Sequence, residues 1–236
     1  MEKRPALILK LLTEEYIKTA TPVASQALVE KYGLDFSPAT VRNDLADLEK
    51  RGYIKQPHTS AGRIPTELAY RYFIKQLKNE APDHQTQIIL KPYFNDLDNN
   101  WKQLAKTLAQ LTDNGIFWSF HRHDSYYTGL SGLLSQPEFK QLPLVYDISQ
   151  VIDSLEEIIA DIFDEIPEKP VIRLGSESPF GPFSSTILTK YRYGENIGLF
   201  GLLTPIRNDY PKNFNLINYV YNHIQSKEKK KEKPTK

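Results

Sequence analysis

The sequence predicts an α+β protein built from two domains. Its 236 residues are enough for two hydrophobic cores of ordinary size, and its 40% hydrophobic and 25% charged residues are typical of soluble globular proteins. The first third of the chain has the apolar spacing of helices, whereas the rest also contains β-branched and aromatic runs typical of strands. We therefore expect one domain over residues 1–80, a second over 81–226 and a disordered basic tail over 227–236.

The composition excludes several classes of protein. The chain has no cysteine, which excludes disulfides, thiolate nucleophiles and cysteine zinc sites. The N-terminal segment lacks the apolar core and cleavage site of a signal peptide, and no apolar run is long enough to span a membrane. These absences predict a soluble, cytoplasmic protein without membrane attachment.

Charge is unevenly distributed along the chain. The net charge of +1 is the balance of +3 over residues 1–80, −6 over 81–226 and +4 over 227–236. A basic first domain joined to an acidic second one suits a nucleic-acid-binding module that is carried by a domain of another role.

The first two helices are expected from apolar spacing and from caps. Apolar side chains three to four residues apart predict a helix from about Arg4 to Lys18. Thr21-Pro22 then has the pattern of an N-cap followed by proline in the first turn. We expect it to open a second helix that ends at Gly33 and buries Val23, Ala27 and Leu28.

The third helix is the candidate recognition helix. Ser37-Pro38 repeats the cap-and-proline pattern, and the spacing of Val41, Leu45 and Leu48 turns that side of the helix toward the core. Short polar side chains therefore project outward from its first turns, as close approach to DNA bases requires. A capped surface helix without a ligand would share this pattern. The residues expected at the bases are Ser37, Ala39, Thr40, Arg42 and Asn43, with Arg42 and Asn43 foremost because arginine pairs with guanine and asparagine with adenine.

A β-hairpin is expected directly after this helix. A short strand over residues 53–56, a turn-rich tip containing Gly62 and a return strand at Arg63-Ile64 have the pattern of a wing. Thr66 should then cap a further helix. Residues expected to contact the DNA backbone or the groove edge are Lys55, His58, Thr59, Ser60, Arg63 and Arg71.

The second domain is expected to combine helices with an antiparallel sheet. The elements predicted in chain order are a helix over residues 85–111, a strand over 116–120, a helix over 149–163, a strand over 170–175, two strands turning at Gly194-Glu195-Asn196, and a helix over 213–224.

Three other motifs have a simpler structural explanation than a chemical one. His121-x-His123-Asp124 has too few ligands nearby for a metal site, and no metal or other cofactor is expected. The loop GSESPFGPFSS could hold an anion through its N–H groups, but its prolines suit a structural turn. The acidic residues around Ile158 and Ile162 have the spacing of a solvated helix face. We see no nucleophile–base pair, so the chain is not expected to be an enzyme.

Several segments resemble the heat-inducible transcription repressor family HrcA. The resemblance covers nearly all of the first domain, most specifically SPATVRNDLADLE and QPHTSAGRIPT. In the second domain it lies in GLSGLLSQPEF, RLGSESPFGPFSS and the segment from IGLFGLLTP to NYVYNHI. The resemblance implies a winged helix-turn-helix followed by a GAF-like domain. Family members are longer, and the part that this chain lacks falls before YYTGLSGLL, where they carry an inserted dimerising subdomain.

The sequence thus predicts a DNA-binding transcriptional repressor that acts as a homodimer on an inverted-repeat operator in double-stranded DNA. The resemblance implies that the operator controls heat-shock chaperone genes and that a GroEL-type chaperonin assists the active fold. Two alternatives remain: a winged-helix regulator of other genes that senses a small ligand, and a protein-interaction adaptor that no longer binds DNA.

Overall fold

The computed structural model describes residues 1–58 and 61–231, and the chain divides into two compact units, Met1–Lys78 and Asn79–Lys236. The first unit contains mainly helices and the second a five-stranded sheet with helices, so the α+β prediction is confirmed. None of the helices in the described part is long and apolar enough to cross a membrane.

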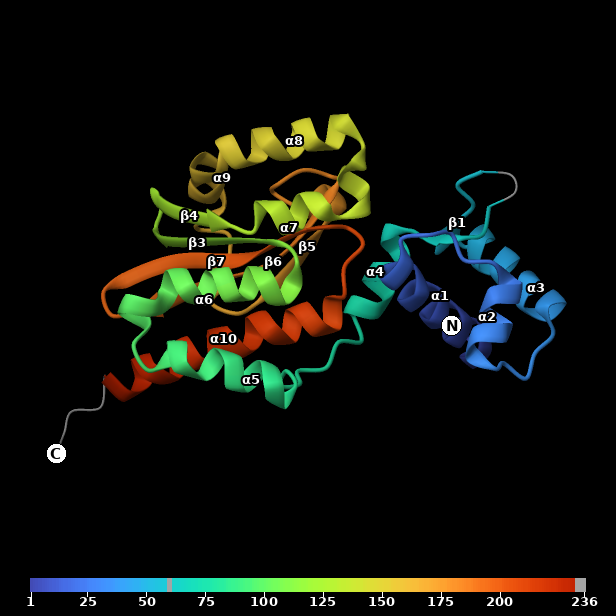
Figure 1. The fold of residues 1–236 in the computed structure, drawn as a ribbon, viewed down its shortest axis with the longest axis horizontal. Coiled ribbons are helices and arrows are strands. Elements are labelled where there is room, and N and C mark those ends of the chain that lie inside the picture. Colours follow the sequence, from blue (N-terminus) through green and yellow to red (C-terminus); the bar gives the residue numbers. More distant parts are fainter. Residues whose placement is uncertain (59–60, 232–236) are drawn as a thin grey trace. The chain divides into compact units, whose positions relative to one another are not determined.

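The first unit is a small helical domain with a two-stranded hairpin (Figure 1). Leucine, isoleucine and valine side chains from its three first helices, its first strand and the segment before its second helix form one buried core. In order, its elements are α1 (Lys3–Thr19), α2 (Ser25–Tyr32), α3 (Pro38–Lys50), β1 (Ile54–Lys55), β2 (Ile64–Pro65) and α4 (Glu67–Ile74).

The second helix begins later than its cap pattern predicts. Its N-cap is Ala24, because the main chain of Val23 pairs with Arg63 in an antiparallel bridge. The side chain of Val23 is buried as expected, but Ala27 is exposed and Ser25 is buried in its place. The expected start at Thr21-Pro22 is therefore wrong. A main-chain pair with a segment forty residues away decides this boundary, and local cap chemistry cannot reveal it.

The second unit is built on an antiparallel sheet. The sheet order is β4-β3-β7-β6-β5, so the sequential hairpins β3–β4 and β6–β7 lie side by side through β3 and β7. The long β6–β7 hairpin turns at Gly194-Glu195, as predicted, and Gly194 takes the left-handed φ of 62° that this turn needs. The strands are β3 (Gly115–His121), β4 (Asp124–Thr128), β5 (Val171–Leu174), β6 (Ser184–Tyr193) and β7 (Asn196–Pro205).

Helices cover both faces of this sheet (Figure 1). Strand side chains alternate between the faces, so Trp118 packs into the core beneath α5, α6 and α10 while Phe117 packs into the core beneath α7, α8 and α9. The helices and 3₁₀ turns are α5 (His84–Leu90), η1 (Lys91–Phe94), α6 (Leu97–Thr112), α7 (Leu130–Ser135), η2 (Pro137–Lys140), α8 (Leu142–Asp153), α9 (Leu155–Ile162), η3 (Gly175–Glu177) and α10 (Tyr210–Lys231).

Two helices expected to be continuous are interrupted. The helix predicted over 85–111 is divided into α5 and α6 by the 3₁₀ turn η1, which contains Pro92. Proline has no N–H to donate and restricts the residue before it, so a helix turns there easily. The helix predicted over 149–163 is divided at Ser154, whose ψ of 13° lies outside the helical range. Apolar spacing continues across both interruptions and therefore does not reveal them.

The basic tail is partly helical. Helix α10 continues to Lys231, so the expectation of disorder from residue 227 is wrong for residues 227–231. Lysine and glutamate are good helix formers, which allows a well-packed helix to propagate into such a segment. Residues 232–236 lie outside the described part of the chain.

Candidate nucleic-acid interface

The first turn of α3 is fixed by a side-chain cap. The Ser37 hydroxyl accepts a hydrogen bond of 3.1 Å from the Thr40 main-chain N–H, and Pro38 occupies the first helical position. Further along, Val41, Leu45 and Leu48 are buried in the core of the first unit, as the apolar spacing predicts. The helix is thus held at its start and along its inner face.

The outer face of α3 presents the residues predicted at the bases. Ala39, Arg42 and Asn43 are exposed, while Thr40 is half-buried beside the Ser37 hydroxyl. Within the described residues, Arg42 and Asn43 make no ion pair or side-chain hydrogen bond, so their donors and acceptors face solvent. Two consecutive side chains that can form hydrogen bonds with DNA bases are therefore exposed on a helix that is held in place.

A buried carboxylate on the inner face of α3 was missed from the sequence. Asp44 receives two hydrogen bonds from the Arg4 guanidinium, Nε to Oδ2 at 2.8 Å and Nη2 to Oδ1 at 3.0 Å. This pairing raises the pKa of Arg4, whose guanidinium also lies 5.6 Å from the centre of the Phe36 ring. The ion pair fixes α3 to α1. Its signal in the sequence is the place of Asp44 beside Leu45, on the side of the helix that faces the core.

The wing is a short antiparallel hairpin. Ile54 pairs with Pro65 and Lys55 with Ile64, and the side chains of Lys55 and His58 are exposed. The predicted contact residues Thr59 and Ser60 lie outside the described residues. Thr66 is the N-cap residue of α4 as predicted, but its hydroxyl donates to the carbonyls of Gly52 and Tyr53 instead of accepting from the helix.

Two arginines predicted to contact DNA phosphates already have acidic partners. The Arg63 Nε lies 2.9 Å from Glu49 Oε2, and this pair joins the wing to α3. Arg71 lies one turn after Glu67 in α4, with its Nη2 2.6 Å from the carboxylate. These pairs partly neutralise both guanidinium groups, whereas Lys55 and Arg42 stay exposed.

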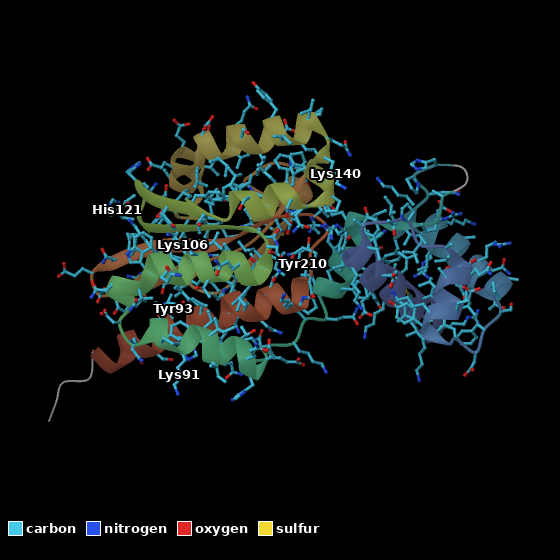
Figure 2. The ribbon with its side chains drawn as sticks, viewed as in Figure 1. Lys91, Tyr93, Lys106, His121, Lys140 and Tyr210 are labelled. Carbon is cyan, nitrogen blue, oxygen red and sulfur yellow. The ribbon has the colours of Figure 1, made fainter. Side chains whose placement is uncertain are left out.

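No metal centre forms from the described residues, which contain no cluster of three or more acidic or histidine side chains that could hold an ion. His121 lies at the outer end of β3 (Figure 2), where its Nε2 is 3.8 Å from the Asp124 carboxylate and both side chains are mostly exposed. The loop over residues 175–185 is held by its own hydrogen bonds, among them Ser178 to Ser184 at 2.7 Å. The acidic side chains predicted on a solvated helix face are exposed, and they are Glu156, Glu157, Asp161, Asp164 and Glu165.

Arg207 is a mostly buried structural residue of the second unit. Its guanidinium donates to the Glu138 carboxylate at 2.6 and 3.0 Å and to the Gln136 side-chain oxygen at 2.8 Å. With only 10% of its side chain exposed, it fixes the loop before α10 to η2.

Comparison with known proteins gives matches to both units. Residues 8–67 match the family described as DeoR-like helix-turn-helix domain, and residues 65–213 match the one described as HrcA protein C terminal domain. A heat-inducible transcription repressor HrcA of Symbiobacterium thermophilum is 25% identical over 333 aligned positions, covering 95% of this chain and 98% of that protein. The alignment is longer than the 236-residue chain, so that relative carries segments that this chain lacks.

Shorter alignments have higher identity. A heat-inducible transcription repressor HrcA of a Roseiflexus species is 37% identical over 72% of this chain, and one of Chloroflexus aggregans is 48% identical over 48% of it. The matched parts span 53% and 32% of those two proteins. A solved structure described as a hypothetical protein aligns with a TM-score of 0.76 at 20% identity, covering 96% of this chain and 98% of its own, which supports the fold.

Proposed function

Because this chain belongs to the HrcA protein family, we propose that it is a sequence-specific DNA-binding transcription repressor that controls heat-shock chaperone genes. The observation that carries the proposal is the outer face of α3. Arg42 and Asn43 stand there exposed, without partners among the described residues, on a helix that a cap, a buried apolar face and an ion pair to α1 hold in place.

In this proposal the start of α3 enters the major groove. Arg42 donates two hydrogen bonds to a guanine, and Asn43 exchanges two with an adenine. Ser37, Ala39 and Thr40 are small enough to let the first turn approach the bases, and the dipole of the helix favours a phosphate near its N-terminus. Discrimination between bases thus comes mainly from two side chains.

Contacts to the DNA backbone position the duplex. Lys55 and His58 of the wing are exposed, and among the described residues neither has an acidic partner that would have to be displaced. Thr59 and Ser60, which lie outside the described residues, are proposed to add hydrogen-bond donors, and Arg71 to add a guanidinium contact. These contacts carry affinity and depend on salt, because each phosphate that is neutralised releases counterions.

Two copies of the chain are proposed to act together. A homodimer with two-fold symmetry reads two half-sites of an inverted repeat in double-stranded DNA. A chaperonin of the GroEL type, the partner that the family resemblance implies, assists the repressor's active fold.

The test is a titration of the purified chain at stated salt against three duplexes: an inverted repeat from upstream of its own chaperone genes, a single half-site and a scrambled sequence. We expect tight binding to the inverted repeat only. Arg42→Ala should weaken that binding by about 1–3 kcal/mol and relax the preference for one base pair. Adding the chaperonin should raise the fraction of chain that binds.

The matched control is Arg51→Ala, which removes an exposed arginine from the C-terminal end of the same helix. Arg51 pairs with Asp47 at 3.3 Å, one turn before it, and lies away from the capped end. Equal binding of the wild type to the operator and to the scrambled duplex, with and without the chaperonin, would contradict the proposed repressor. An equal loss in the Arg42 and Arg51 variants would contradict the orientation of α3.

A further inference from the structure

Glu49, which lies at the C-terminal end of α3, holds both strands of the wing. Its Oε1 accepts a hydrogen bond of 3.0 Å from the main-chain N–H of Gln56, directly after the first strand. Its Oε2 accepts a hydrogen bond of 2.9 Å from the Nε of Arg63, just before the second strand. One carboxylate on the recognition helix therefore joins it to the two sides of the hairpin.

The same side of the wing is also joined to the segment before α2. The main chains of Arg63 and Val23 exchange two hydrogen bonds, of 2.8 and 2.9 Å. Gly62 allows this approach, because a Cβ there would lie 2.4 to 2.7 Å from main-chain atoms of Val23. Across the hairpin, the side-chain amide of Gln56 donates to the Ala61 carbonyl at 2.9 Å.

We propose that Glu49 is a positioning residue for DNA binding, and that Arg63 acts through Glu49 to orient the wing instead of serving as a phosphate ligand. This inference rests on the proposed function of the first unit. The helix in the major groove and the wing on the DNA backbone can contact one duplex at the same time only if the angle between helix and wing matches the shape of the duplex. The carboxylate sets that angle in the free protein, so the wing needs no ordering when DNA binds.

Simple electrostatics predicts the opposite effect for this residue. Glu49 carries a negative charge within a surface that is proposed to face a polyanion, so its removal should strengthen DNA binding if charge alone mattered. A positioning role predicts weaker binding. The sign of the change therefore separates the two explanations.

The experiment compares Glu49→Gln with Asp47→Asn in the full chain, by fluorescence anisotropy on the inverted-repeat operator. Glu49→Gln keeps an oxygen for the Gln56 N–H and removes the charge that holds Arg63. Asp47 is an exposed carboxylate two residues earlier on the same helix, so its variant controls for the lost charge. We expect affinity to fall about tenfold in Glu49→Gln, the scale of one hydrogen bond to a charged group, and to stay equal or rise in Asp47→Asn.

The dependence of binding on salt tests the role of Arg63. Arg63→Gln should weaken binding as much as Glu49→Gln does, without changing the slope of log K against log[salt], and the double variant should be no weaker than either single one. A phosphate ligand would instead reduce that slope by about 0.9 on removal. The proposal is overturned if Arg63→Gln reduces the salt slope while Glu49→Gln leaves binding unaffected.

A second measurement does not depend on DNA. Amide hydrogen exchange at Arg63, whose main-chain N–H donates to Val23, should be faster in Glu49→Gln than in the wild type, because the Arg63 side chain then no longer holds the wing to α3. It should be unchanged in Asp47→Asn, with melting curves showing that both variants are folded. Unchanged exchange in Glu49→Gln overturns the proposal. If the wild type binds the operator no better than a scrambled duplex, the proposed function fails; if it binds specifically and Glu49→Gln is neutral, only the role of Glu49 fails.

Discussion

The Glu15 carboxylate links the end of α1 to the end of α2. Lys31 donates to it at 2.8 Å and the Tyr32 hydroxyl at 3.0 Å, and only 13% of the Glu15 side chain is exposed. The hydrogen bond from Lys31 holds the pKa of Glu15 below its ordinary value of 4.5. Burial, with Glu15 nearby, raises the pKa of Tyr32 to about 12. The carboxylate is thus stabilised in its charged form by the fold.

This lowered pKa predicts how stability depends on pH. The charged form of Glu15 contributes its full stabilisation above the ordinary pKa of 4.5, and the contribution is lost as the pH falls through the lower value of the folded state. We expect Glu15→Gln to be less stable than the wild type at pH 7, and the difference to shrink as the pH falls below 4.5. Urea denaturation at a series of pH values measures it.

Glu14→Gln is the control for this pH series. The Glu14 carboxylate is more exposed and lies 3.7 Å from Lys10, within one helix. Exposed pairs of this kind contribute little to stability, so its curve should follow that of the wild type. A constant difference between Glu15→Gln and the wild type at every pH would show that the carboxylate's charge is not what stabilises the helix ends.

At the scale of the element, α3 is ordered by its N-terminal cap and by its buried face. The helix has thirteen residues and no acidic side chain in its first turn, and the Ser37 hydroxyl at its start accepts a hydrogen bond from the Thr40 main-chain N–H. Isolated helices of this length are only marginally stable in water, so both the cap and the buried face are needed to order it. The cap lies at the end that is proposed to meet the bases.

Removing the cap should therefore reduce the stability of the first unit. Ser37→Ala leaves the Thr40 N–H without its acceptor and should lower the free energy of unfolding by about 1 kcal/mol, whereas Ser37→Asp should restore most of it. Urea denaturation of both variants provides the measurement. Equal stability of Ser37→Ala and the wild type would show that water replaces the cap at no cost.

At the scale of the molecule, the described residues form three buried hydrophobic clusters in two units. The first unit has one core of its own, and the second has one on each face of its sheet. Residues 1–78 therefore contain both a hydrophobic core and the whole candidate interface. A single copy therefore carries one complete interface, and any gain in operator affinity from two interfaces requires two copies of the chain to associate.

A fragment of residues 1–78 tests this division. We expect it to fold cooperatively, since its core is complete, and to bind a single half-site much as the full chain does. On the inverted repeat it should bind on the order of 100-fold more weakly than the full chain, because two unlinked fragments lose the high effective concentration of a dimer. Sedimentation equilibrium and anisotropy titrations provide the two measurements. Equal affinity of the fragment and the full chain for the inverted repeat would place dimerisation within the first unit or exclude it.

Local features of the sequence predict several elements of this protein. Apolar spacing predicts α1, α3 and the helix before the tail, and β-branched and aromatic content with its turn residues predicts the β6–β7 hairpin, because each is set by neighbours within a few turns or strand residues. The caps at Ser37 and the turn at Gly194 were equally local. The late start of α2 was missed because a main-chain pair with Arg63, forty residues away, overrides the local cap pattern. The interruption at Ser154 was missed because apolar spacing continues across it, and the helical tail because its charge was given more weight than the helix propensity of lysine and glutamate.

For the candidate interface, apolar spacing is enough to predict which side chains of α3 point outward, because burial of Val41, Leu45 and Leu48 fixes the rotation of the helix. Spacing does not assign partners to the charged residues. The folded arrangement of the first unit shows that Asp44 pairs with Arg4 and that Glu49 holds Arg63. Such pairs join residues 40 and 14 positions apart, and a charge has no periodic signature that would mark its partner along the chain.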